Sequence, residues 1–139
     1  MPQLIRRIGD TLAEIASVAA EAETFCAADG ADESQSLRIG LAVDELAANA
    51  LIHGAAREEA PDVVVEIWTD ACELNLRVSA RGPRFDPRER REKTPEEFAI
   101  GGRGLTLVLA FADRLAYARD GERNVTTFTV AKFARPEVD

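Results

Sequence analysis

Residues 44–54 read DELAANALIHG, and three polar side chains recur at intervals of four in this otherwise apolar stretch: Glu45, Asn49 and His53. On an α-helix, positions four apart differ by about 40° around the axis, so these side chains follow one edge of the helix. One interpretation is that they are boundary residues whose polar groups are satisfied by neighbouring backbone. The other is that Glu45 and Asn49 face a cleft and act together on a phosphate-containing ligand.

The residue types suit such a ligand. An asparagine amide offers a neutral oxygen to a hard cation such as magnesium, which prefers oxygen ligands. A glutamate can accept the proton of a hydroxyl or water nucleophile. His53 lies one turn farther along, where a structural role at the helix end is expected because histidine interacts favourably with the C-terminal end of the helix dipole.

Composition narrows the class of protein. The chain has 139 residues, of which 46% are hydrophobic and 30% charged, so a packed single domain covering residues 1–139 is expected. The net charge of -8 and the sequence pI of about 4.7 make nucleic acid and acidic membranes poor partners. The basic run RERREK at 88–93 is an exception, and it is typical of a solvated loop or helix face.

Cysteine usage and hydropathy favour a cytoplasmic protein. Cys26 and Cys72 have no CxxC or Cys/His spacing that would hold a metal, and both are expected to be reduced thiols. No apolar run approaches the ~18 residues that a membrane span requires, and the N-terminus lacks the apolar segment of a signal peptide.

Propensity and capping patterns predict the order of elements. A short strand at 3–8 precedes a helix that Asp10 caps and that ends near residue 28, at Asp29 and Gly30. Asp32 and Gln35 form a capping box at the start of a second helix that Gly54 ends. Apolar residues at three-four spacing are predicted to form its core stripe, namely Leu37, Leu41, Ala48 and Ile52.

The second half of the chain is predicted to be mainly strands. Strands at 63–69 and 74–78 flank a hairpin turn at 70–73, and strict alternation in the second strand favours a sheet that is covered on one face. A long loop at 82–104 contains turn signals at 86–89 and 94–97. A helix at 105–113 and strands at 115–119 and 125–133 follow, the strands joined by an Asp120–Gly121 turn. The fold class is therefore α/β, a two-layer sandwich with helices on one face of a mostly antiparallel, mixed sheet.

A glycine cluster, Gly101-Gly102-Arg103-Gly104, directly precedes the apolar helix at 105–113. Flexible backbone and a positive helix N-terminus are presented together there, which favours an anion site. A plain loop is the alternative.

Three segments in this order resemble the motifs of the histidine-kinase-like ATP-binding (GHKL) superfamily, which includes gyrase, Hsp90, histidine kinases and MutL. DELAANALIHG is similar to its N-box, ARGPRFDP at 80–87 to its first glycine box, and GGRGLTLV at 101–108 to its second. The short form with an alanine-rich first helix resembles bacterial anti-sigma factors and serine-protein kinases of the RsbW type. The resemblance spans residues 3–133 and implies the Bergerat ATP-binding fold.

The resemblance also implies roles for residues, with ATP and magnesium as cofactors. Glu45 is the implied general base that activates a partner's serine hydroxyl, and Asn49 the implied nucleotide and magnesium ligand. Thr127 corresponds to a threonine near the adenine, with Thr126 as the alternative if the alignment slips by one. The other implied cofactor-binding residues are Gly82, Gly101, Gly102, Arg103, Gly104 and Leu105.

The first glycine box departs from the family pattern D-x-G-x-G. Ala80 stands where the family has the aspartate that accepts a hydrogen bond from the adenine amino group, and Arg84 stands at the second glycine. A hydrogen bond to a charged acceptor is worth about 1.5 to 3 kcal/mol, so nucleotide affinity is expected to fall roughly ten- to a hundredfold or more. Asp86 is expected to cap a turn, not to replace the lost acceptor.

The resemblance implies a cytoplasmic bacterial regulator that binds a sigma factor or an anti-sigma factor antagonist and, if nucleotide still binds, phosphorylates a partner serine with ATP. The alternative, favoured by Ala80 and Arg84, is a non-catalytic interaction module of the same fold. A histidine kinase or ATPase is a third interpretation, disfavoured because no helix pair carrying a phospho-accepting histidine precedes the domain. Family members commonly dimerise, so a homodimer is an open expectation.

Overall fold

The computed structural model describes residues 3–9, 11–54, 60–89, 108 and 110–132. Val108, Ala110 and Phe111 are helical and belong to the predicted helix at 105–113, whose other residues before 110 lie outside the described part. The longer elements are, in chain order, β1 (Gln3–Ile8), α1 (Leu12–Ala28), α2 (Glu33–Gly54), β2 (Val63–Thr69), β3 (Glu73–Arg81), β4 (Arg114–Asp120) and β5 (Arg123–Ala131).

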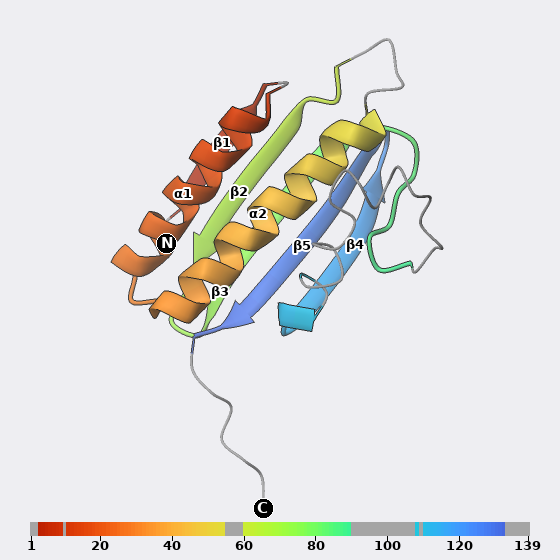
Figure 1. Ribbon diagram of the computed structural model, residues 1–139. Helices are drawn as coiled ribbons and strands as arrows, with labels where there is room; N and C mark the ends of the chain where they lie inside the picture. Colours follow the sequence, from red (N-terminus) through yellow and green to blue (C-terminus); the bar gives the residue numbers. More distant parts are fainter. Residues whose placement is uncertain (1–2, 10, 55–59, 90–107, 109, 133–139) are drawn as a thin grey trace, which may run out of the picture.

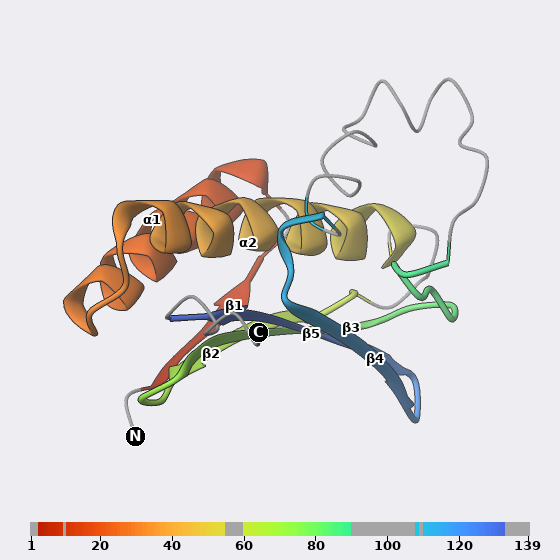
Figure 2. The same ribbon diagram turned by 90° about the horizontal axis from the view of Figure 1, so that it is seen from below.

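The strands form one five-stranded sheet in the order β1-β2-β3-β5-β4. Each described pair of neighbouring strands is antiparallel. Both α1 and α2 lie on the same face of this sheet, as Figures 1 and 2 show. The predicted α/β sandwich with helices on one face is therefore confirmed. In the described part of the chain, neither helix is long and apolar enough to cross a bilayer.

Capping residues define the ends of the two helices. At α2, Gln35 N donates to Asp32 Oδ1 at 2.7 Å and Asp32 N donates to Gln35 Oε1 at 2.9 Å, so the predicted capping box is confirmed. The N-cap of α1 is Thr11, not Asp10 as predicted. Thr11 Oγ1 accepts from Glu14 N at 3.3 Å, and Glu14 is the residue type that can return a bond from the third helical position.

Local hydrogen bonds also form the predicted turns. Gly30 follows α1 with φ of 92°, a backbone angle that favours glycine. In the β2–β3 turn, Asp70 Oδ1 accepts from Cys72 N at 2.7 Å and from Glu73 N at 2.8 Å. These backbone bonds lower the pKa of the Asp70 carboxyl.

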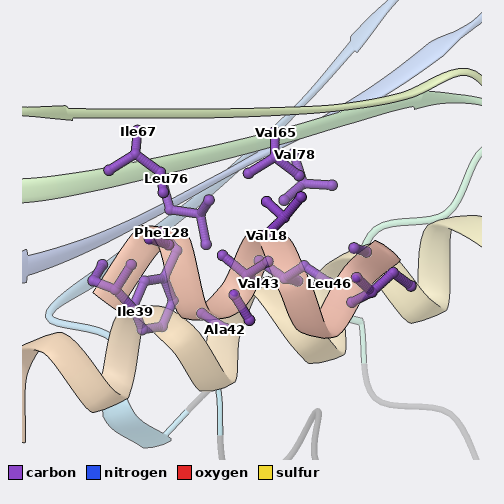
Figure 3. Packing of buried hydrophobic residues seen from close by; sticks show 14 of the residues in the cluster. Val18, Ile39, Ala42, Val43, Leu46, Val65, Ile67, Leu76, Val78 and Phe128 are labelled. Carbon is purple, nitrogen blue, oxygen red and sulfur yellow. The ribbon is translucent and has the colours of Figure 1, made fainter. Parts of the chain in front are cut away.

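The core lies between the helices and the sheet, as Figure 3 shows. Strand residues that face the helices are almost inaccessible to solvent, and the α2 residues that contact them form one face of that helix. The buried core residues include Ile39, Ala42, Val43, Leu46 and Ala47 on α2 and Val65, Ile67, Leu74, Leu76, Phe128 and Val130 on the strands.

The predicted core stripe of α2 is wrong for its three large residues. Leu37, Leu41 and Ile52 are 51%, 37% and 40% exposed, whereas Ala48 is half-buried and packs against the core. The helix carries two apolar lines with three-four spacing on roughly opposite sides, and the line that faces the sheet is the one containing Ile39, Val43 and Leu46. The spacing alone does not distinguish which line is buried.

An ionic cluster joins the end of α1 to the sheet. The Asp29 carboxylate accepts hydrogen bonds from Thr69 Oγ1 and from Lys132 Nζ, the latter at 2.9 Å. The bond from Thr69, and next the bond from Lys132, lowers the pKa of the Asp29 carboxyl. Cys26 is fully buried beside this cluster, and burial raises the pKa of its thiol to about 12. Both Cys26 and Cys72 are free thiols.

Shortening two neighbouring side chains of α2 tests which of its faces is buried. Ile39→Ala is expected to lower the free energy of unfolding by about 2 to 5 kcal/mol because Ile39 is inaccessible in the core. Leu41→Ala, two residues away, is expected to cost less than about 1 kcal/mol because Leu41 is partly in solvent. Urea unfolding of both variants measures the difference, and equal losses would contradict this assignment of the faces.

Candidate functional site

A small cavity lies between the second half of α2, the ends of β3 and β5 and the loop that follows β3; we call it the helix–loop cavity. Its volume is about 30 Å³. Its lining includes Leu46, Asn49, Ala50, His53, Val78, Ala80, Gly82, Phe85, Asn124 and Thr126. The cavity therefore brings together the N-box segment and the first glycine box, as the sequence predicted, together with side chains that it did not single out.

Asn49 is one of two polar side chains that α2 offers at this cavity, the other being His53. Its Nδ2 atom is buried and has no hydrogen-bond partner among the described residues. A buried amide without a partner costs about 1 to 3 kcal/mol, so an atom that accepts this bond would be stabilised there. Asn49 is thus a candidate for binding a polar ligand.

An aromatic stack fills the space next to Asn49. The His53 ring, one turn along α2, lies 3.9 Å from the Phe85 ring between centroids, and the two planes differ by 21°. Phe85 belongs to the first glycine box, in the loop that follows β3. The stack therefore joins the end of α2 to this loop across the cavity.

The loop is fixed in this position by the β4–β5 hairpin. Asn124 Oδ1 accepts from Phe85 N at 3.0 Å, and Asn124 Nδ2 donates to the Pro83 carbonyl at 2.9 Å. Arg119 Nη1 donates to the Gly82 carbonyl at 2.6 Å. Because Asn124 and Arg119 bond backbone atoms of the loop, they determine where the Phe85 ring lies.

The remainder of the loop forms a turn around Asp86. Asp86 is buried, and its Oδ1 accepts from Arg88 N at 2.9 Å, while the Asp86 carbonyl accepts from Glu89 N at 3.1 Å. The ion pair with the Arg88 guanidinium at 2.8 Å is the largest influence that lowers the Asp86 pKa. The predicted turn-capping role of Asp86 is confirmed. Arg84 points to the Tyr117 ring, 5.5 Å from its centroid.

The β3–β5 register determines which strand residues reach the cavity. Val78 pairs with Thr126 and Ala80 with Asn124, and all four line the cavity. Ala80 is 4% exposed and supplies only a methyl group to the wall. Successive side chains alternate between the faces of a sheet, so Thr127 points to the face away from the helices. The structure favours Thr126, the alternative position, over Thr127 as the threonine of the pocket.

Other predicted site residues do not line the cavity or are not described. Glu45 is half-buried on α2, one turn before Asn49, and is outside the cavity lining. The second glycine box, with Gly101, Gly102, Arg103, Gly104 and Leu105, lies outside the described residues, so its predicted role in holding phosphate stays a prediction.

The cavity fits the two implied cofactors unequally. Pockets for ligands of nucleotide size typically have about 300 to 1,000 Å³, an order of magnitude more than this cavity, so the described residues leave no space of nucleotide size here while Phe85 stacks on His53. The residues present suit magnesium better than a nucleotide, because magnesium usually takes only one or two ligands from the protein. Asn49 offers an amide oxygen, and the described residues contain no cluster of three acidic, His or Cys side chains that would hold a metal ion.

Four further residues at this site are not among the predicted ones, namely Phe85, Tyr117, Arg119 and Asn124. The last strand is predicted to begin at residue 125, whereas β5 begins at Arg123 and includes Asn124. The pairing of Asn124 with Ala80 depends on the β3–β5 register, which has no local signal. The contact between Phe85 and His53 has no local signal, because it depends on how the loop folds back over α2.

Comparison with known proteins agrees with the fold. The family model of the histidine kinase-like ATPase domain matches residues 8–130. The crystal structure of the RsbU and RsbW domains of Rv1364c from Mycobacterium tuberculosis is similar, with a TM-score of 0.67 at 21% sequence identity. The match covers 97% of this chain and 34% of that one, so the chain spans about a third of its length. No curated protein matches the sequence significantly.

The His53–Phe85 stack can be tested by a double-mutant cycle. The single variants His53→Ala and Phe85→Ala and the double variant are expected to show a coupling of about 0.5 to 1.5 kcal/mol in the free energy of unfolding. Urea unfolding measures all four proteins. As a control, Phe111→Ala is combined with His53→Ala, and the changes in the free energy of unfolding of these two variants are expected to add. Additive changes for His53→Ala and Phe85→Ala would contradict the stack.

Proposed function

Because the chain belongs to the histidine kinase-like ATPase family, we propose that it is a regulatory domain of the RsbW type that acts by binding a sigma factor or an anti-sigma factor antagonist. The family is one of ATPase domains, and ATP is the cofactor that membership implies. In this chain the partner is bound without nucleotide, because the base-binding part of the pocket is filled. The protein is a non-catalytic interaction module in this state.

One observation carries this proposal: the helix–loop cavity measures about 30 Å³, with the Phe85 ring stacked on His53 beside it. Two further features agree with it. Ala80 offers no acceptor for an adenine amino group, and the loop that carries Phe85 is fixed by three hydrogen bonds to Asn124 and Arg119. Opening the pocket requires these bonds to rearrange.

The partner side is tested by titration against the sigma factors and antagonist domains encoded by the same genome. At least one is expected to bind with an affinity that millimolar Mg-ATP changes by less than about twofold, because a nucleotide that does not bind cannot be coupled to the partner. Isothermal titration with and without Mg-ATP measures this. A change of about tenfold or more would contradict the nucleotide-independent part of the proposal.

A second candidate function, serine phosphorylation, is favoured by the unpartnered Nδ2 of Asn49. A buried amide left without a bond is expected at a site built to receive a polar ligand. In this function Asn49 Nδ2 would donate to a phosphate oxygen, the Asn49 amide oxygen would hold magnesium, and Glu45 would accept the proton of the partner's serine hydroxyl. Glu45→Gln would then leave nucleotide binding intact and lower the rate of transfer by about 10²- to 10⁴-fold.

Nucleotide titration separates the two functions. The wild-type chain is expected to bind Mg-ATP no more tightly than millimolar, Ala80→Asp alone to bind little better, and the double variant Ala80→Asp/Phe85→Ala to bind about ten- to a hundredfold more tightly. The physical reason is that the base needs both space and an acceptor. Isothermal titration calorimetry of the wild-type chain, the two single variants Ala80→Asp and Phe85→Ala, and the double variant measures these affinities.

A matched control places the same charge outside the pocket. Ala118 is exposed on β4, so Ala118→Asp/Phe85→Ala supplies an aspartate that cannot reach the cavity and is expected to leave Mg-ATP affinity unchanged. Thermal unfolding without ligand checks that the Ala80→Asp substitution is tolerated, because Ala80 is buried. Micromolar binding by the wild-type chain would overturn the closed pocket and favour the kinase.

A further inference from the structure

The outer side of α2 carries an apolar line whose three large side chains are partly exposed, whereas its fourth member, Ala48, is half-buried and packs against the core. Leu37, Leu41, Ala48 and Ile52 fall within about 60° of one another around the helix axis, on the side away from the sheet. We call them the α2 stripe. Leu37, Leu41 and Ile52 are 51%, 37% and 40% exposed, and they are three of the five large hydrophobic side chains that are exposed in the described part of the chain.

A row of carboxylates follows one edge of the α2 stripe. Asp44 lies about 20° from Leu37 around the axis, between the stripe and α1. Gly40 faces α1 on the same side, because a Cβ there would overlap the Glu23 carboxylate. Glu23 of α1 therefore lies over this edge, and Glu33 lies at its start. Arg38, the only Lys or Arg of α2, lies on the opposite edge.

These carboxylates are not neutralised within the fold. Asp44 is half-buried, and neither it nor Glu23 has an ion pair or hydrogen bond among the residues that the structure describes. Desolvation raises the pKa of the Asp44 carboxyl. A cation brought to this edge would therefore meet a partly dehydrated carboxylate, where an ion pair is worth more than at a fully hydrated surface.

We propose that the α2 stripe is a docking surface for an amphipathic helix of a partner protein, one with an apolar line for Leu37, Leu41, Ala48 and Ile52 and with lysine or arginine along the edge that meets Asp44 and Glu23. A ridge of three-four spacing is the surface against which another helix packs. The stripe spans about 22 Å, the length of a partner helix of about 15 residues. Exposed apolar surface with a polar rim is typical of protein interaction sites.

Charge argues against a second copy of this chain as the occupant. An antiparallel, two-fold related pair of stripes brings the same edge of each helix together. Asp44 lies near the middle of the stripe, so it would face Asp44 of the other copy, and the two Glu23 side chains would be added to the same repulsive edge. A basic partner turns the same groups into attractive contacts.

A designed peptide tests the proposal without the natural partner. The probe is a fluorescein-labelled, alanine-based helix of about 18 residues whose leucines repeat the stripe's four, seven and four spacing, with lysines along one edge. A second peptide has glutamates in place of the lysines. Fluorescence anisotropy without nucleotide is expected to show saturable 1:1 binding of the lysine peptide and at least tenfold weaker binding of the glutamate peptide.

Variants locate the binding surface. Leu41→Glu is expected to weaken binding of the lysine peptide about tenfold or more, and Asp44→Asn is expected to weaken it roughly threefold. Leu12→Glu and Glu122→Gln make the same two kinds of change at exposed positions away from the stripe and are expected to leave affinity within about twofold of wild type. Ile52→Glu replaces Leu41→Glu if thermal unfolding shows that the latter is not folded.

Each outcome decides the proposal. Equal weakening by stripe and control variants would mean general attraction to an acidic protein, and stripe variants that bind like wild type would place the peptide elsewhere; both overturn it. A dimer in analytical ultracentrifugation that Leu41→Glu dissociates would assign the stripe to a second copy and also overturn it. The peptide titrations contain no nucleotide, so their result does not depend on whether the helix–loop cavity binds ATP.

Discussion

The pairing of β3 with β5 is the constraint on which both the core and the cavity depend. These strands are far apart in the sequence, and their register places Leu76 opposite Phe128 under the helices. The same register places Ala80 opposite Asn124 at the far end. The loop after β3 therefore lies next to the β4–β5 hairpin, where the Asn124 side chain forms hydrogen bonds with the backbone of Pro83 and Phe85. A shift by one residue would turn Thr126 and Phe128 away from the helices.

Features that depend on near neighbours could be predicted from the sequence. The Asp32–Gln35 capping box, the Asp70 turn and the alternation of β3 each involve residues a few positions apart, so their signals are local. The family resemblance assigned Asn49 and Gly82 to one cofactor site, and both line the helix–loop cavity. The features that could not be predicted depend on contacts between residues far apart in the sequence. Two apolar lines of equal spacing on α2 cannot be ranked without knowing which one the sheet covers.

Ala80 and the closed cavity are consistent with each other. An aspartate at this buried position would carry a charge that needs a partner, and without a ligand its desolvation would be costly. Alanine removes that cost, and an apolar wall is compatible with the Phe85 ring packed beside it. In the proposed function the His53–Phe85 stack takes up the space that a base would need, and the hydrogen bond from Phe85 N to Asn124 fixes the loop that carries the Phe85 ring. The energetic conflict that remains in the cavity is the buried amide of Asn49.

The distribution of ion pairs distinguishes the two outer surfaces of the sandwich. On the open face of the sheet, carboxylates have partners: Glu66 pairs with Arg77 at 2.6 Å, and Asp62 with Arg7 at 3.0 Å and Arg123 at 3.2 Å. Arg77 also lies 4.9 Å from the Trp68 ring centroid. These groups are already engaged within the chain, so a charged partner there would have to compete with existing contacts.

On the helical layer the balance is different. Glu21 pairs with Arg6, but Glu23 and Asp44 have no such partner among the described residues. Their charge contributes to the net value of -8 without local compensation, and it lies beside Leu37 and Leu41, which solvent reaches. Uncovered apolar surface and uncompensated charge coincide along α2, whereas on the sheet face most charges are matched. The physical case for a protein partner therefore rests on the helices and not on the open sheet.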